Sequence, residues 1–85
     1  MPKSVFSEAY EILLEELVSA RDEAGITQTE LGKRLNRPQP FVSYFERGER
    51  RIDLIEFVAI ARALEIKPDK LFARVLARLP SDISI

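Results

Sequence analysis

The stretch of sequence that decides the fold is residues 27–48, TQTELGKRLNRPQPFVSYFERG. Thr27, followed three residues later by Glu30, forms a capping-box pattern that predicts a helix beginning at Gln28. Leu31 and Leu35 stand at i, i+4 spacing and face inward, so we expect this helix to span about Gln28–Leu35.

A polar turn at residues 36–38 leads into a second short helix. Pro38 and Pro40 are tolerated only in the first turn of a helix, where the backbone N–H groups have no partner within the helix. This helix therefore begins near Pro38 or Gln39 and runs to about Arg47, before a glycine. Two short helices joined by a tight turn are the unit with which many small proteins place a helix in the major groove of DNA.

The residues before this unit predict a long first helix. Ser7 is its expected N-cap, and Gly25 is expected to end it. Its apolar stripe consists of Tyr10, Leu13, Leu14, Leu17, Val18 and Ala20.

The residues after the unit predict two more helices. Asp53 and Glu56 form a second capping-box pattern, which opens a helix to about Leu64. Pro68 at a first helical position opens the last helix, and Pro80 ends it. The sequence thus predicts an all-α fold of five helices in one domain, residues 1–85, with a core at about 8–79 and a short tail at 80–85.

Composition excludes several classes of function. The chain of 85 residues has no cysteine and no histidine, so a disulfide framework, a thiolate metal site and the usual general base are all missing. The carboxylates of Glu11, Glu15 and Glu16 are interpreted as a solvated helix face. We expect no enzyme, cofactor or metal. No apolar run approaches the roughly 20 residues of a membrane span and no signal peptide is evident, so we expect a cytoplasmic protein.

The net charge of −1 is unevenly distributed along the chain. Residues 1–26 contain two basic and six acidic residues, a balance of −4. Residues 27–52 contain six basic and three acidic residues, a balance of +3, whereas residues 53–85 are neutral. The excess positive charge therefore lies in the segment expected to face DNA, although solvated helix faces would have the same pattern.

These features together resemble the lambda-repressor-like Cro/C1-type (XRE) family of phage and bacterial regulators, over roughly residues 12–73. The resemblance rests on Arg21 placed four residues before Gly25 and on three runs of sequence. The runs are Thr27–Leu31, Val42 with Phe45–Gly48, and Ile66–Phe72. The resemblance implies a helix-turn-helix formed by the second and third helices.

The third helix divides into two faces on a helical wheel. Val42 and Phe45 point to the core, with Phe41 partly buried. The resemblance places Gln39 at the first base-reading position of the family, where its amide can pair with adenine. The residues expected to contact DNA bases are on the outward face: Gln39, Pro40, Ser43 and Tyr44.

Other residues are expected to contact phosphates or to hold the fold. Gln28 matches a glutamine that the family uses to brace the DNA backbone and the recognition helix. The expected phosphate contacts are Gln28, Arg37, Arg47, Arg50 and Arg51. The resemblance also implies a structural ion pair between Arg21 and Glu46.

The last helix offers a candidate dimer face, formed by Leu71, Phe72, Val75, Leu76 and Leu79. These residues could instead complete the core of the monomer. The leading hypothesis is a sequence-specific transcriptional regulator, a dimeric repressor on a double-stranded operator. The alternative is a protein-interaction module of the same fold, such as an antitoxin or antiactivator, with weak or secondary DNA binding. Pro40, Glu49 and the acidic first helix motivate that alternative and a possible protein partner.

Overall fold

The computed structural model describes residues 8–83, which form five helices and no strand. The helices are α1 (Glu8–Glu23), α2 (Gln28–Leu35), α3 (Gln39–Glu46), α4 (Leu54–Ala63) and α5 (Pro68–Arg78). The expected all-α fold is confirmed, and the predicted ends of the second, third and fourth helices agree within about one residue. Ser7, the predicted N-cap of α1, lies outside the described residues. Within residues 8–83, no helix is long and apolar enough to cross a membrane.

Local side-chain signals determine where α2, α3 and α4 begin. The Thr27 hydroxyl accepts a hydrogen bond from the backbone N–H of Glu30 at 3.0 Å, which is half of the predicted capping box. The predicted capping box of Asp53 and Glu56 is complete. The Glu56 backbone N–H donates to Asp53 Oδ1 at 2.7 Å, and the Asp53 backbone N–H donates to Glu56 Oε1 at 2.9 Å. Pro38 is the N-cap of α3 and makes no capping hydrogen bond, because its side chain has no acceptor, while Pro40 lies in the first turn, where its missing N–H would have no partner within the helix.

Gly32 allows the turn and α3 to pack tightly against α2. A Cβ atom on Gly32 would lie 3.1 Å from the carbonyl oxygen of Arg37 and 3.4 Å from Cα of Gln39. Both neighbours are backbone atoms, which cannot swing aside as a flexible side chain would. The missing side chain therefore sets the close approach of α2 to the first residue of α3.

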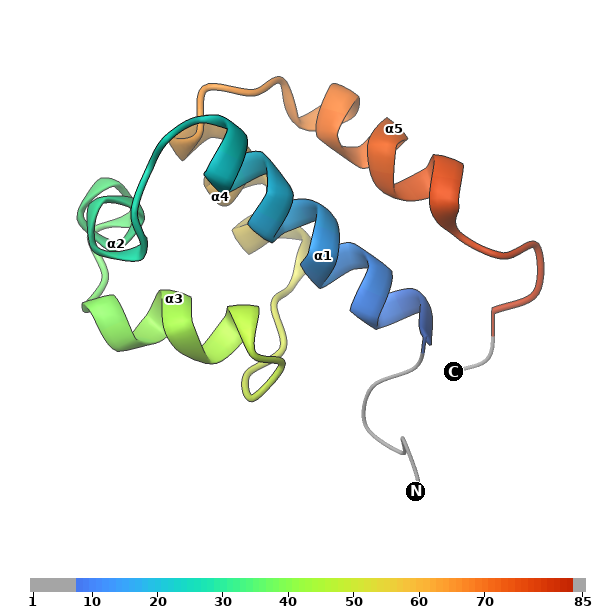
Figure 1. Cartoon of the computed structure of the whole chain (residues 1–85), viewed down its shortest axis with the longest axis horizontal. Helices are drawn as coiled ribbons and strands as arrows, with labels where there is room; N and C mark the ends of the chain where they lie inside the picture. The colour runs from blue at the N-terminus through green and yellow to red at the C-terminus, as the bar shows by residue number, and fades with distance from the viewer. Residues whose placement is uncertain (1–7, 84–85) are drawn as a thin grey trace.

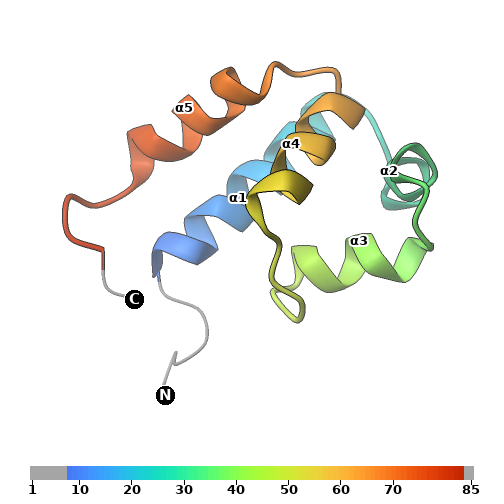
Figure 2. The ribbon, with the colours of Figure 1, turned by 180° about the vertical axis from the view of Figure 1, so that it is seen from behind.

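The helices surround one core (Figures 1 and 2). α1 runs through the middle of the molecule, with α5 antiparallel to it on one side and α3 on the other. α2 and α3 form a corner at one end, and α4 lies behind α1 in Figure 1 and in front of it in Figure 2. α3 therefore lies at the edge of the molecule with one face covered and the other open.

The core corrects part of the predicted dimer face on α5. Leu71 and Val75 are 0% and 3% exposed, so they pack inside this chain and are not available to a second copy. Phe72 and Leu76 remain 45% and 52% exposed, and Leu79 is half-buried. Residues four apart share one side of a helix, whereas sequence neighbours point in different directions. Leu71 and Val75 therefore face the core, while Phe72 and Leu76 face solvent.

Ion pairs join α1 to α5 and correct a second interpretation. Arg78 contacts Glu15 at 2.7 Å and Glu16 at 2.9 Å, while Arg74 contacts Glu16 and Glu23, each at 3.1 Å. Hydrogen bonds from Arg78 and Arg74 outweigh burial and lower the pKa of Glu16. Glu16, 14% exposed, is therefore part of an interhelical network, whereas Glu15, 61% exposed, stays on the solvated face and pairs there with Arg78.

Candidate nucleic-acid interface

The two faces of α3 separate the packing residues from the polar residues. Val42 and Phe45 are fully buried, and Phe41 is half-buried with its ring edge-on to that of Phe45, at 5.6 Å between centroids. On the opposite face, Gln39, Pro40 and Tyr44 are exposed and Ser43 is half-buried. The four residues expected to contact bases thus share one accessible surface, which ordinary amphipathic spacing creates.

A chain of hydrogen bonds connects the interior to the start of α3. Arg21 grips the Glu46 carboxylate with two hydrogen bonds, Nε to Oε2 at 2.7 Å and Nη2 to Oε1 at 3.1 Å. Gln28 Nε2 donates to the same Oε1 at 2.8 Å. Gln39 Nε2 in turn donates to Gln28 Oε1 at 3.4 Å. α1, α2 and both ends of α3 are therefore joined through polar side chains.

This chain determines which way each amide points. Because Gln28 gives its N–H group to Glu46, its carbonyl oxygen faces Gln39. Gln39 uses one N–H toward Gln28 and keeps its own oxygen and a second N–H for another partner. An acceptor beside a donor is the pair that matches the major-groove edge of adenine.

Two of the arginines expected to contact phosphate are paired with carboxylates. Arg47 holds Glu49 at 3.0 and 3.1 Å, and Arg50 holds Glu56 at 2.9 and 3.1 Å. Hydrogen bonds from Arg47 lower the pKa of Glu49, and hydrogen bonds from Arg50 lower that of Glu56. The sequence had shown Glu49 only as a negative charge in a basic loop, and the partnership of Glu56 with Arg50 was missed.

Aromatic rings hold the arginines near the turn and the loop. The guanidinium carbons of Arg37 and Arg50 lie 5.3 and 4.8 Å from the centroid of the Phe41 ring. The guanidinium carbon of Arg51 lies 4.1 Å from the centroid of the Tyr10 ring. Arg37 from the α2–α3 turn and Arg50 from the loop after α3 are therefore both close to the ring of Phe41, where cation–π attraction favours them.

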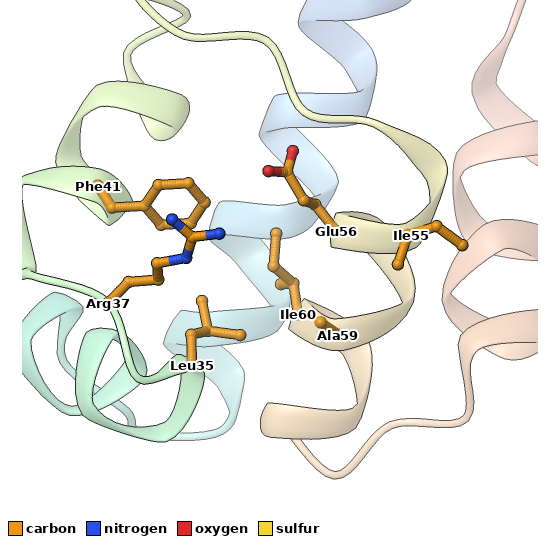
Figure 3. Close-up of a pocket in the computed structure, with 7 residues that line it drawn as sticks. All are labelled: Leu35, Arg37, Phe41, Ile55, Glu56, Ala59 and Ile60. Carbon is orange, nitrogen blue, oxygen red and sulfur yellow. The ribbon is translucent and has the colours of Figure 1, made fainter.

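A pocket of about 210 Å³ lies between the α2–α3 turn and α4 (Figure 3). Leu35 and Ile60 form apolar walls, and Arg37 extends in front of the Phe41 ring toward Glu56. Ile55, which is 74% exposed, stands at the outer edge. The pocket is thus apolar with charged groups at one side.

Comparison with known proteins agrees with this geometry. The Helix-turn-helix family model matches residues 17–71, which include all of α2, α3 and α4. An XRE-family like protein from Pseudomonas syringae pv. tomato str. DC3000 is 47% identical, covering 85% of this chain and 88% of that one, with a TM-score of 0.79. This chain belongs to the Cro/C1-type (XRE) helix-turn-helix family. It is accordingly a DNA-binding domain of a regulator family and not an enzyme.

More distant solved structures share the fold of this helix-turn-helix domain. The clp gene regulator ClgR from C. glutamicum is 20% identical, with a TM-score of 0.75 over 89% of this chain and 99% of that one. A point mutant of the restriction-modification controller protein C.Esp1396I is 24% identical, with a TM-score of 0.79 over 91% and 99%. No curated protein sequence matches the chain.

Proposed function

We propose that this helix-turn-helix domain is a sequence-specific transcriptional repressor that binds its operator as a homodimer. The observation that carries the proposal is the outward face of α3, on which the Gln39 amide is oriented by Gln28 and Glu46. A side chain that is already oriented loses less conformational freedom when it binds. In this role the protein acts in the cytoplasm, where it blocks a promoter by occupying it.

The bases would be contacted by four side chains along α3. Gln39 offers a donor and an acceptor to adenine, which is worth roughly 1–3 kcal/mol of discrimination. Tyr44, 47% exposed, reaches a thymine methyl group or a phosphate one turn further on. Pro40 adds apolar contact, and the Ser43 hydroxyl adds a hydrogen bond to base or phosphate.

The phosphates would be bound by groups that surround this face. Gln28 lies at the start of α2, where backbone N–H groups also point outward and suit a phosphate oxygen. Arg37, Arg47, Arg50 and Arg51 are all exposed. Each arginine that neutralises a phosphate releases counterions, so binding should weaken steeply with added salt.

Dimerisation would use the part of α5 that the core leaves open. Phe72 and Leu76 are exposed and Leu79 is half-buried beside them. The two copies of a dimer would bind half-sites about 34 Å apart on the duplex. Leu76→Glu should convert the dimer to a monomer in sedimentation, because Leu76 is 52% exposed and its loss leaves the core intact. A wild-type mass that stays monomeric at all concentrations would contradict the dimer.

The function is tested by selecting bound sequences from random double-stranded DNA with the full chain. We expect an enriched, two-fold symmetric site, with a logarithm of affinity that falls linearly with the logarithm of salt concentration. Recovery of no preferred sequence at low salt would overturn the proposal.

That negative outcome would favour a second candidate, a protein-interaction module with weak or secondary DNA binding. Leu54 and Ile55 at the start of α4 are 70% and 74% exposed, and Ile55 borders the apolar pocket. Adjacent exposed apolar side chains of this size are typical of protein contacts. Selection from random DNA therefore separates the two candidates.

A further inference from the structure

The contacts of Arg47 occupy all three nitrogens of its guanidinium group. Nε and Nη2 donate to the two oxygens of Glu49, and Nη1 donates to the Ser43 hydroxyl. The guanidinium carbon also lies 5.4 Å from the centroid of the Tyr44 ring. Arg47, while it is paired with Glu49, therefore also contacts Ser43 and Tyr44, two residues of the proposed reading face.

The backbone fixes the position of Glu49. Gly48 adopts φ +80°, and its N–H donates to the Phe45 carbonyl oxygen at 3.1 Å. The N–H of Glu49 donates to the Tyr44 carbonyl oxygen at 2.8 Å. The turn after α3 therefore brings the Glu49 carboxylate back beside the last residues of the helix.

Phosphate and Glu49 require the same atoms of Arg47. A carboxylate and a phosphate are both bound by the parallel N–H groups of a guanidinium, and both are anions. The Arg47 and Glu49 side chains are 51% and 56% exposed, so the pair is open to exchange with an external anion. While it persists, the pair is neutral and contributes no net attraction to DNA.

We infer that Glu49 is an internal competitor of the DNA phosphate for Arg47, and that the Arg47–Glu49 pair keeps Arg47 from a full ionic contact with the DNA backbone. Glu49 thereby lowers the affinity of the domain for DNA in general. While the pair lasts, Arg47 also stays in contact with Ser43 and Tyr44. This inference rests on the proposed function, because it concerns the same surface.

The neighbouring pair differs in a way that isolates Glu49. Glu56 is only 20% exposed and also caps α4 through its bond to the backbone N–H of Asp53, so it has a structural task as well. Glu49 makes its side-chain contacts with Arg47. Removing the charge of Glu49 therefore changes the competition for Arg47 while the helix caps remain.

The test measures affinity for the selected site by fluorescence anisotropy over a series of salt concentrations, with the full chain and its Glu49→Gln variant. Gaining one phosphate contact steepens the slope of log affinity against log salt by about 0.9 and strengthens binding about fivefold at 0.15 M salt. Glu23→Gln is the matched control. Glu23 also binds an arginine, Arg74, with both oxygens, but this pair joins α1 to α5, away from α3. It should leave slope and affinity at the wild-type values.

A second pair of variants shows whether Glu49 acts through Arg47. In an Arg47→Gln background, Glu49→Gln should no longer steepen the slope. An unchanged slope or weaker binding in Glu49→Gln, or the same gain without Arg47, would overturn the inference. Wild-type protein that binds no preferred site would instead overturn the proposed function, so the two failures are distinguishable.

Discussion

Glu46 and Glu49 lie three residues apart, and each grips an arginine with both oxygens, yet their surroundings differ completely. The side chains of Arg21 and Glu46 are 13% and 6% exposed, whereas those of Arg47 and Glu49 are 51% and 56% exposed. Arg21 also donates to the Ile26 carbonyl oxygen at 2.8 Å, and Gln28 also binds Glu46. The inner pair is part of the fold, while the outer pair can be exchanged for another anion. The two pairs have the same chemistry, so the difference in burial is what separates a structural ion pair from an exchangeable one.

The sharpest way to break this comparison is to remove each carboxylate in turn. Glu46→Ala leaves Arg21 partly buried without its partner, which should cost about 3 kcal/mol of unfolding free energy. For a domain of this size that lowers the melting temperature by roughly 12–24 °C. Glu49→Ala, the matched control, should melt close to wild type, because exposed pairs contribute little. Equal melting temperatures for the two variants, measured by circular dichroism, would remove the distinction.

Gln28 links the inner pair to the reading face, so its loss should lower both the stability of the domain and its preference for adenine. Gln28→Ala removes one bond to Glu46 and the support of Gln39, and we expect a loss of about 1 kcal/mol in stability. Preference for adenine at the position that Gln39 reads should fall by about 1 kcal/mol as well. Competition between the selected site and a site lacking that adenine measures the second effect. Wild-type discrimination in Gln28→Ala would show that Gln39 is not oriented by Gln28.

Acid titration should produce the smallest effect and should distinguish a largely covered carboxylate, Glu16, from the exposed carboxylate of Glu49. The pKa of Glu16 is held below its ordinary value of 4.5, chiefly by hydrogen bonds from Arg78, and its side chain is only 14% exposed. A lowered folded-state pKa contributes stability above about pH 4.5 that is lost as the pH falls through the folded value. Glu16→Gln should therefore flatten the fall in melting temperature below pH 4.5. Glu49→Gln should flatten it less, since Glu49 is exposed; the reverse order would contradict this account.

The residues that could be read from sequence were those governed by short-range rules. Thr27 and Asp53 marked helix starts because a cap acts on the next three residues. Pro38 and Pro40 located the start of α3 because only a first turn tolerates them. The inward positions of Val42 and Phe45 followed from helical spacing alone.

Long-range contacts were harder to predict. The apolar run on α5 could not show that Leu71 and Val75 face the core, since that depends on how α5 packs against α1 and α4. The pairing of Arg50 with Glu56 also escaped prediction, because flexible side chains of opposite charge have many possible partners in a basic loop. Arg21 and Glu46 were paired through family resemblance, and their spacing of 25 residues carries no local signal.

The central claim is that the outward face of α3 reads DNA, and one binding measurement tests it directly. The affinity of the Gln39→Ala, Tyr44→Ala double variant for the selected site is compared with that of the wild type, with melting temperature as the control for folding. Loss of two base contacts predicts a drop of roughly a hundredfold, toward the level of non-specific DNA, with the melting temperature unchanged. A double variant that folds normally and still binds the site with wild-type affinity would contradict the claim.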